Sequence, residues 1–309
     1  MGRAVKRALR VPSFAKINLG LEVLGVREDG THELRTLFQT VDLADEIVLR
    51  PRPNKSGVTV ACDHPLVPKD GTNLAARAAE ALRQHGHVEA GVHIEITKRI
   101  PVGGGLGGGS SNAAAVLRGL DRLWRLGLGP DGLHRLARKL GADVPYFLLG
   151  GTALGLARGD EVYPLRRQIQ GRVVLVDAGF PVSTAAVFRR LDASLTPREN
   201  SNSIFYFVSS DLEGKHALRL LTNDLEQAAL EEAPALKERA ERIRGVLIQA
   251  GAGLAALTGS GSTYFGLFDE AAPALRARKI LVAAGFRALL ARTVSLDQYR
   301  RVWSQSLGR

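Results

Sequence analysis

Residues 101–115 read P-V-G-G-G-L-G-G-G-S-S-N-A-A-A, and six glycines fall within seven consecutive positions that Leu106 interrupts. Without a side chain, such a backbone adopts φ > 0 easily and lets a ligand approach its N–H groups closely. Ser110, Ser111 and Asn112 are N-cap residue types, and a helical pattern starts immediately after them. A glycine loop that leads into a helix N-terminus presents unpaired N–H donors and the positive end of the helix dipole. The stretch therefore predicts an anion site, most often one for phosphate.

The residues on both sides of the glycines indicate a structural unit rather than a flexible linker. Before the loop, Val92, Ile94 and Ile96 alternate with polar residues, which is typical of a half-buried strand. After the loop, apolar residues recur at helical spacing, at positions 113, 116, 117, 120, 123 and 124. A strand, a glycine loop and a helix in this order favour phosphate binding over the alternative of a Gly-rich linker.

The better-known phosphate loops fit this stretch less well. The P-loop pattern G-x-x-x-x-G-K-[ST] is absent because no lysine precedes Ser110. The dinucleotide fingerprint G-x-G-x-x-G matches at Gly103, Gly105 and Gly108, but so many glycines make that match nearly unavoidable. A Rossmann unit also needs a second strand that ends in an acidic residue, whereas a second helical pattern follows here, around residues 133–140. A nicotinamide cofactor is therefore not expected.

The composition is that of an ordinary globular protein of one large or two smaller domains, with 309 residues, 45% hydrophobic and 24% charged. The single cysteine, Cys62, excludes an intramolecular disulfide and fits a reducing cytosol, so we expect a cytoplasmic protein. No apolar run approaches the roughly 20 residues of a membrane helix, and the basic N-terminus lacks the apolar region of a secretory signal. We expect no membrane partner.

The net charge of +11 raises the alternative of a nucleic-acid-binding protein. However, the 42 basic residues are spread along the chain, and only 6% of the residues are aromatic, which leaves few platforms for base stacking. We interpret the charge as a solvated surface that favours anionic substrates, and we expect no nucleic-acid partner. His85, His87 and His93 lack supporting carboxylates at ligand spacing, so no protein metal site is predicted there.

The loop P-x-G-G-G-L-G-G-G-S-S-N-A-A resembles the ATP-binding motif of the GHMP kinases, a family that includes galactokinase, homoserine kinase and mevalonate kinase. The resemblance implies ATP and Mg²⁺ as cofactors. The doubled G-G-G and the S-S-N ending are most similar to the branch that phosphorylates a cytidine-diphosphate sugar alcohol in the non-mevalonate isoprenoid pathway. The positions implied to bind ATP are Asn73, Lys98, Pro101, Val102, Gly103, Gly104, Gly105, Leu106, Gly107, Gly108, Gly109, Ser110 and Ser111. Asn73 precedes a helical pattern, so it is also a candidate N-cap.

Residues 11–23 read V-P-S-F-A-K-I-N-L-G-L-E-V, so Lys16 and Asn18 would share one face of a strand. On the residues alone, a strand with one wet face is the simpler interpretation. The segment resembles the family's A-K-I-N-L motif, whose lysine lies beside the reacting hydroxyl and whose asparagine contacts the substrate. Residues 139–147, K-L-G-A-D-V-P-Y-F, resemble the family's G-A-D-V-P-F-F, whose aspartate is the catalytic base. The resemblance therefore implies that Lys16 and Asp143 are catalytic, although they are far apart in the sequence.

Residues 29–39, D-G-T-H-E-L-R-T-L-F-Q, resemble the segment with which this branch holds the cytidine and sugar-alcohol parts of its substrate. His32 and Phe38 match positions that contact the cytosine. Thr31 departs from the pattern because the family usually has tyrosine there, so stacking on the base should be weaker or shifted elsewhere. With a second segment around residues 177–188, the substrate-binding positions implied by the resemblance are Asn18, His32, Phe38, Phe180 and Thr184.

Residues 257–268, L-T-G-S-G-S-T-Y-F-G-L-F, resemble the third GHMP motif, so three motifs occur in the family's order. Periodicity alone indicates mixed α and β structure. The resemblance implies an α+β, two-domain GHMP kinase fold, with a ribosomal protein S5 domain 2-like N-terminal domain over residues 1–155 and a ferredoxin-like C-terminal domain over residues 156–309. It also implies a kinase for a small-molecule substrate that is a monomer or weak homodimer. The alternatives are another GHMP kinase with a homoserine- or mevalonate-type acceptor, and a non-catalytic nucleotide- or nucleic-acid-binding protein.

Overall fold

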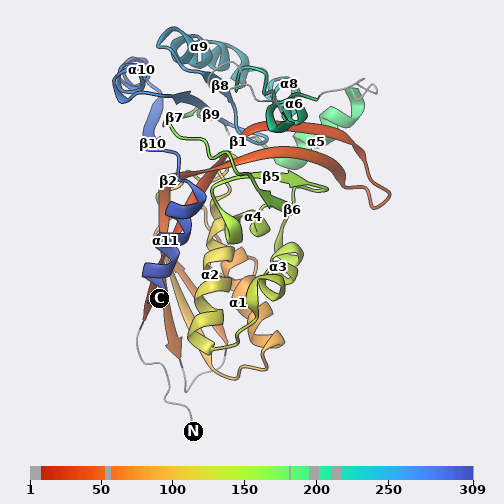
Figure 1. Cartoon of the computed structure of the whole chain (residues 1–309), viewed down its shortest axis with the longest axis vertical. Coiled ribbons are helices and arrows are strands. Elements are labelled where there is room, and N and C mark those ends of the chain that lie inside the picture. The colour runs from red at the N-terminus through yellow and green to blue at the C-terminus, as the bar shows by residue number, and fades with distance from the viewer. Residues whose placement is uncertain (1–7, 53–56, 181, 195–201, 210–217, 309) are drawn as a thin grey trace.

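The computed structural model describes residues 8–52, 57–180, 182–194, 202–209 and 218–308, which form two β-sheets with helices packed against them (Figure 1). The strands of the first sheet are β1 (Leu9–Val26), β2 (His32–Arg52), β3 (Val58–Cys62), β4 (Gly91–Thr97), β5 (Thr152–Leu156) and β6 (Glu161–Pro164). They follow the order β3-β4-β2-β5-β6, with β1 paired to β2. β1 and β2 form a long antiparallel ribbon in which Lys16 lies opposite Thr40 and Asn18 lies opposite Phe38.

The helices that pack against the first sheet are α1 (Leu74–His85), α2 (Gly108–Trp124), α3 (Gly129–Leu140), α4 (Val144–Leu149) and the C-terminal α11 (Leu296–Ser306). The alternating apolar residues of β4, Val92, Ile94 and Ile96, are buried in this core, which confirms the predicted strand. α11 returns from the other half of the chain to lie beside α2 (Figure 1). Its Tyr299 and Trp303 are buried in the same core, so the C-terminus helps to stabilise the first sheet.

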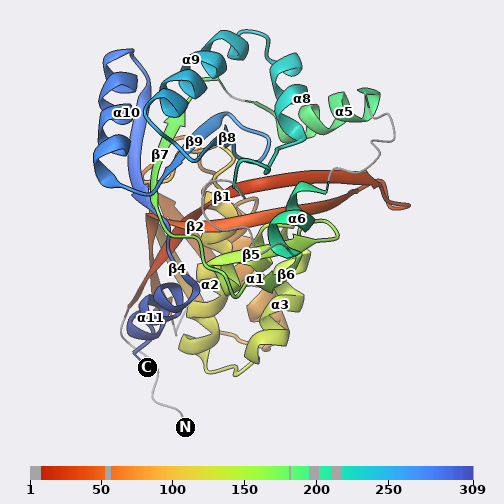
Figure 2. The same ribbon diagram turned by 45° about the horizontal axis from the view of Figure 1, so that its top comes forward.

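The second sheet consists of β7 (Arg172–Asp177), β8 (Leu254–Leu257), β9 (Thr263–Phe268) and β10 (Arg287–Arg292), in the order β10-β7-β9-β8. The connecting helices are α5 (Thr184–Ser194), α6 (Ser203–Ser209), α8 (Leu225–Glu232), α9 (Leu236–Gln249) and α10 (Ala271–Ala283), and α8, α9 and α10 cover the outer side of the sheet (Figure 2). Helices separate β7 from β8 and β9 from β10, whereas β8 and β9 pair directly. This is the split βαβ arrangement of ferredoxin-like domains, so the predicted α+β fold with a ferredoxin-like C-terminal part is confirmed.

A shared apolar core joins the two sheets, and the alternation of side chains along β7 explains it. Val174 packs with the outer helices, whereas Val173 and Leu175 face the first sheet, in a cluster that includes Ile17 of β1. The same cluster contains Leu106, the residue that interrupts the glycines, with 1% of its surface exposed. The glycine loop is therefore anchored between the sheets by its one large side chain.

Two elements link the halves of the chain across the expected division. β6, at residues 161–164, pairs with β5 in the first sheet, and α11 packs on the core of that sheet. A domain boundary between residues 155 and 156 stays a prediction. Throughout the described ranges, no helix has both the length and the apolar character needed to cross a membrane.

Candidate active site

The helix after the glycine loop begins earlier than the sequence predicts. α2 starts at Gly108 with Gly107 (φ +70°) as its N-cap, so residues 110–112 lie inside the helix rather than before it. The physical reason is that glycine adopts the left-handed cap conformation without steric cost, so no Ser or Asn cap is needed. The first helical hydrogen bond runs from Ser111 N to Gly107 O, at 2.9 Å. The N–H groups before Ser111 therefore lack a partner within the helix and suit a phosphate.

A cavity of about 350 Å³ follows this loop and the start of α1. The expected ATP-binding positions that line it are Asn73, Lys98, Pro101, Val102, Gly103, Gly104, Gly105, Leu106, Gly107, Gly108, Gly109 and Ser110. The side chain of Asn73 accepts a hydrogen bond from Ala75 N (2.9 Å) and donates one to Pro68 O (2.6 Å). Its predicted role as N-cap of α1 is confirmed, and the same bonds shape the wall of the cavity.

Ser111 does not line this cavity, because its side chain points into a buried polar network. Ser13 donates to Ser111 Oγ at 2.8 Å, and the Asn112 amide donates to Ser13 Oγ (2.8 Å) and to Asp45 Oδ2 (2.9 Å). The fully buried Asp45 carboxylate also pairs with Lys98 and accepts hydrogen bonds from the next two backbone N–H groups, at 2.8 Å each. Asp45, which the sequence pattern does not single out, thus ties β2 to both ends of the glycine loop.

The structure brings Lys16 and Asp143 together, with 3.4 Å between Lys16 Nζ and Asp143 Oδ2. Lys16 has 4% of its side chain exposed, donates to Asn18 Oδ1 at 2.6 Å, and is tied to the glycine loop by its backbone N–H, which donates to Leu106 O at 3.1 Å. Asp143 lies between the end of α3 at Gly141 and the start of α4, with 34% of its side chain exposed. A buried cation therefore stands beside an accessible carboxylate.

The third motif is joined to the other two through Thr258. Asn18 N donates to Thr258 Oγ1 at 3.0 Å, and the same hydroxyl donates to Gly105 O at 3.4 Å. The Asn18 amide also donates to Thr36 Oγ1 at 2.8 Å, which fixes its rotamer. The strand that carries Lys16, the glycine loop and the 257–268 loop therefore form one connected unit.

A second cavity, of about 580 Å³, opens on the side of this unit where Asp143 is accessible. We call it the acceptor cavity. Gly105, Gly107 and Ser110 line both the acceptor cavity and the cavity along the loop. Molecules bound in the two cavities would therefore meet at the glycine loop, beside Lys16 and Asp143.

Aromatic side chains form one wall of the acceptor cavity. His32 packs against Phe188 of α5, with 4.4 Å between ring centroids and 31° between ring planes. His32 Nε2 lies 2.7 Å from Asp192 Oδ1, which orients the imidazole. The backbone N–H of Thr31 donates a hydrogen bond to Asp29 Oδ1, with 3.0 Å between N and Oδ1. Sequence reasoning missed Phe188, whose signal was an aromatic residue at the end of the 177–188 segment.

Phe38 contributes an apolar side chain to the same cavity and packs against Tyr146. Its ring is 1% exposed and stacks on Tyr146 at 4.6 Å. Tyr146 donates to Gly151 O at 2.8 Å, and its hydroxyl lies 2.6 Å from Thr40 Oγ1. Burial raises the pKa of Tyr146 well above its ordinary value, so the hydroxyl stays protonated as a donor.

Of the two expected positions after β7, the structure places one at the cavity. Thr184 lines it, with Oγ1 2.7 Å from Ser260 Oγ of the third motif. Phe180 packs instead against the core of the second sheet, and its ring centroid is 5.7 Å from the guanidinium carbon of Arg239. A contact of Phe180 with substrate stays a prediction.

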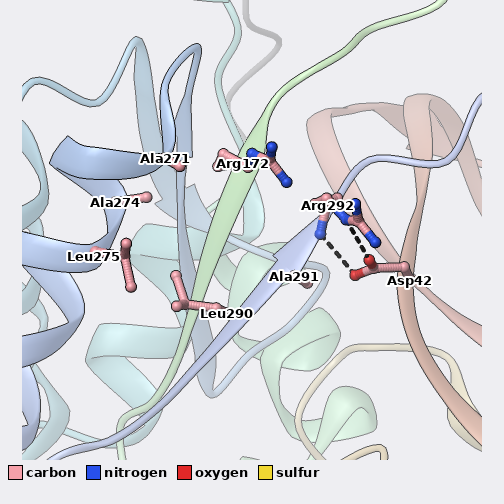
Figure 3. Close-up of a pocket in the computed structure, with 8 residues that line it drawn as sticks. All are labelled: Asp42, Arg172, Ala271, Ala274, Leu275, Leu290, Ala291 and Arg292. Carbon is pink, nitrogen blue, oxygen red and sulfur yellow. Dashed lines mark hydrogen bonds and ion pairs between the residues drawn. The ribbon is translucent and has the colours of Figure 1, made fainter.

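Two other hollows on the surface share no lining residue with these two cavities. A larger one, of about 690 Å³, lies between β3 and α1. Another, of about 230 Å³, is lined mainly by apolar residues of α10 and β10, and Figure 3 shows Arg292 reaching across to Asp42 of β2. Arg292 Nε lies 2.9 Å from Asp42 Oδ2, so this contact links the two sheets, and neither Lys16 nor Asp143 lines this hollow.

Comparison with known proteins defines the class of this fold and site. The N-terminal domain model of the GHMP kinases matches residues 73–151, and the GHMP kinase C-terminal model matches residues 212–287. A homoserine kinase structure from Cytophaga hutchinsonii superposes with a TM-score of 0.74 over 96% of this chain and 97% of that one, at 19% identity, and so shares the fold. The chain belongs to the GHMP kinase family.

Within the family, the chain is most clearly similar to 4-diphosphocytidyl-2-C-methyl-D-erythritol kinases. The kinase of that name from Gloeobacter violaceus is 44% identical over 274 residues, which cover 87% of this chain and 88% of that one. The one from Geobacillus kaustophilus is 39% identical and covers 85% and 89%. A crystal structure of 4-(cytidine 5'-diphospho)-2C-methyl-D-erythritol kinase superposes with a TM-score of 0.74 at 36% identity, over 92% of this chain and 99% of that one. The predicted resemblance to this branch is confirmed.

Proposed function

We propose that the chain transfers the γ-phosphoryl group of ATP to the 2-hydroxyl of 4-diphosphocytidyl-2-C-methyl-D-erythritol. One observation carries the proposal: the two cavities meet at the glycine loop, next to Lys16 and Asp143. Phosphoryl transfer depends on in-line positioning and charge neutralisation more than on covalent chemistry. Relatives of that name, similar over most of their length, support the choice of acceptor.

The roles of the residues follow from their positions. Asp143 would accept the proton of the acceptor hydroxyl, since its carboxylate is accessible from the acceptor cavity. Lys16 would stabilise the negative charge that develops during transfer, and its bond to Asn18 holds it in place. The backbone N–H groups at the start of α2 would bind the phosphates of ATP.

The residues at the meeting point fit Mg²⁺, because proteins hold this ion through one or two carboxylates together with substrate phosphates. The carboxylate of Asp143 and the hydroxyl of Ser110 would hold it here. When bound, it would neutralise charge on the phosphate oxygens. The described residues contain no cluster of three or more His, Cys, Asp or Glu that could hold a metal, so the remaining ligands would come from the nucleotide.

The aromatic wall favours a nucleotide-bearing acceptor over a small aliphatic one. His32 and Phe188 offer ring faces and a hydrogen-bonding group for a nucleobase, and the buried Phe38 adds an apolar side chain to the wall. Phe188 supplies a ring on the side where Thr31 has none. Homoserine and mevalonate have no base and would leave this wall unused. A cytoplasmic location and a monomeric or weakly dimeric state stay predictions.

The proposed function is tested by coupled detection of ADP released from ATP and Mg²⁺ with three acceptors in parallel: the cytidine substrate, homoserine and mevalonate. We expect turnover with the cytidine substrate alone, and phosphorus NMR of the product should show a phosphomonoester on the 2-hydroxyl. Turnover with homoserine or mevalonate alone would keep the kinase fold and refute the proposed acceptor.

A further inference from the structure

The acceptor cavity has a second positive side chain, Arg158, on its wall. Among the described residues that line the cavity, Lys16 and Arg158 carry a permanent positive charge. Lys16 serves the reacting end, whereas Arg158 lies between β5 and β6, close to the turn that contains Thr31. Hydrogen bonds from Thr31 hold the pKa of Asp29 below its ordinary value, and the charge of Arg158 contributes to this shift. Arg158 therefore lies beside the segment that leads to His32.

The turn that presents Arg158 is fixed and locally strained. Ala157 has φ +58°, a left-handed conformation that is unfavourable for a residue with a Cβ, and Gly159 has φ +85°. Ala157 O accepts a hydrogen bond from Leu34 N at 2.6 Å, which fastens the turn to β2. Residues in such conformations persist where the surrounding structure enforces them, and they concentrate at ligand sites.

The buried carboxylate of Asp160 fixes the position of the Arg158 side chain. Asp160 is fully buried, and its Oδ2 accepts hydrogen bonds from Arg158 Nη2 (2.7 Å) and Arg138 Nε (2.9 Å). Burial opposes the charge of Asp160, but the two arginines outweigh it and lower its pKa, so the carboxylate is ionised. The bond to Asp160 uses Nη2 of Arg158, and a guanidinium has five N–H donors, so donors remain for a ligand in the cavity. The guanidinium fork matches phosphate oxygens with paired donors.

We propose that Arg158 binds the diphosphate of the acceptor substrate and that Asp160 is the positioning residue that holds Arg158 for it. The substrate would extend from its hydroxyl at Asp143 to its base at His32, and the diphosphate connects these two parts. It must therefore cross the cavity between them, and Arg158 lines this cavity close to the turn that leads to His32. The proposal rests on the proposed function, because neither homoserine nor mevalonate has a diphosphate.

The test compares wild type, Arg158→Gln and Arg158→Lys. In Arg158→Gln we expect KM for the cytidine substrate and the inhibition constant of CDP to rise about 10- to 100-fold, because the variant loses a charge-assisted hydrogen bond. KM for ATP and inhibition by cytidine, which lacks phosphate, should change less than about threefold. Arg158→Lys should recover part of the loss because it keeps the charge without the fork. Arg172→Gln, the same charge change at the hollow in Figure 3, is the matched control and should leave every constant unchanged.

The Asp160 role has its own readout. Asp160→Asn should raise KM for the cytidine substrate while kcat stays near that of wild type, and it should add nothing in the Arg158→Gln background. A merely structural role would lower kcat, and would do so equally in both backgrounds. Because Arg138 still pairs with Asp160, Arg158→Gln should keep a thermal midpoint close to that of wild type.

The outcomes separate the two proposals. An active wild type whose Arg158→Gln variant keeps its KM and its CDP inhibition overturns the role of Arg158 alone. Equal weakening of CDP and cytidine inhibition also overturns it, because it would indicate general damage to the cavity. A wild type that is inactive with the cytidine substrate overturns the proposed function and, with it, this inference.

Discussion

Neutralising Asp45 should destabilise the protein strongly, although Asp45 itself contacts neither cavity. Its carboxylate is fully buried beside the Lys98 ammonium, which is 5% exposed, and it also accepts from two backbone N–H groups and Asn112. Removing one partner of such a pair leaves the other charge uncompensated, at a cost of about 3–5 kcal/mol. Asp45→Asn should therefore lower the free energy of unfolding by about that amount.

Removing the charge of Lys98 instead should cost less, because the Asp45 carboxylate keeps three N–H donors. Lys98→Met should lose about 1–3 kcal/mol, since hydrogen bonds to a charged group remain. In the double variant the loss should fall short of the sum by at least about 1.5 kcal/mol, the signature of a coupled pair. Glu95→Gln is the matched control: it breaks the exposed Arg50–Glu95 pair (2.6 Å) and should cost less than about 1 kcal/mol.

Urea unfolding and KM for ATP, measured on the same variants, decide the outcome. Because its charge is already paired with Asp45, Lys98→Met should raise KM for ATP less than about fivefold. The reasoning is refuted if Asp45→Asn loses no more stability than Glu95→Gln. It is refuted equally by a rise in KM above about thirtyfold in Lys98→Met at unchanged stability, which would make Lys98 a direct phosphate ligand.

Further variants at the glycine loop, at Thr258 and at Asp160 test the loop and the cavity wall. Gly105→Ala (φ +73°) should abolish turnover, measured as ADP release, because its Cβ would lie 2.3 Å from Thr258 O. The control is Gly103→Ala (φ +76°), whose Cβ would meet no atom within 4 Å. It should remain active in the same assay, at a cost of about 1–2 kcal/mol of backbone strain. Thr258→Val should lower kcat about 5- to 30-fold by removing the acceptor for Asn18 N, and Thr258→Ser should restore it. Asp160 has a lowered folded-state pKa, so its stabilisation is present above its unfolded pKa of about 3.9 and is lost as the pH falls through the folded value. In Asp160→Asn, the free energy of unfolding measured by urea titration should therefore fall less steeply as the pH is lowered.

The parts of the fold that depend on short-range order could be predicted from the sequence. The alternation of Val92, Ile94 and Ile96 identified β4 because one face of that strand is buried. Asn73 was recognisable as an N-cap from its position before an apolar helical pattern. The shared face of Lys16 and Asn18 on β1 followed from the two-residue period of a strand.

Contacts between distant segments could not be predicted in this way. The start of α2 was misplaced because Gly107 caps the helix, and the side chains of Ser111 and Asn112 instead bond to Ser13 and Asp45, which nothing in the local pattern reveals. The packing of His32 on Phe188 joins the start of β2 to a helix of the second half. Such pairings depend on how the two sheets dock, which periodicity does not encode.

The proposed catalytic pair, Lys16 and Asp143, lies between these two cases. On the residues alone, Lys16 was one polar residue on a strand and Asp143 one turn residue before Pro145. The resemblance to the GHMP kinases paired them, and the structure places them 3.4 Å apart. Arg158 and Asp160 escaped both approaches, since neither belongs to a quoted motif and their significance depends on burial and on the cavity wall.

The most direct test of the mechanism is the turnover of Asp143→Asn, with ATP binding measured in parallel by calorimetry. Asp143 lines the acceptor cavity and is absent from the lining of the cavity along the glycine loop, so Kd for ATP, measured without the Mg²⁺ that Asp143 would help to hold, should stay within about threefold of wild type. As the general base, Asp143 should contribute about 10²- to 10⁴-fold to kcat, and the variant should lose that factor. A loss of less than about tenfold at unchanged Kd would contradict this role and leave Asp143 a residue that only positions the acceptor.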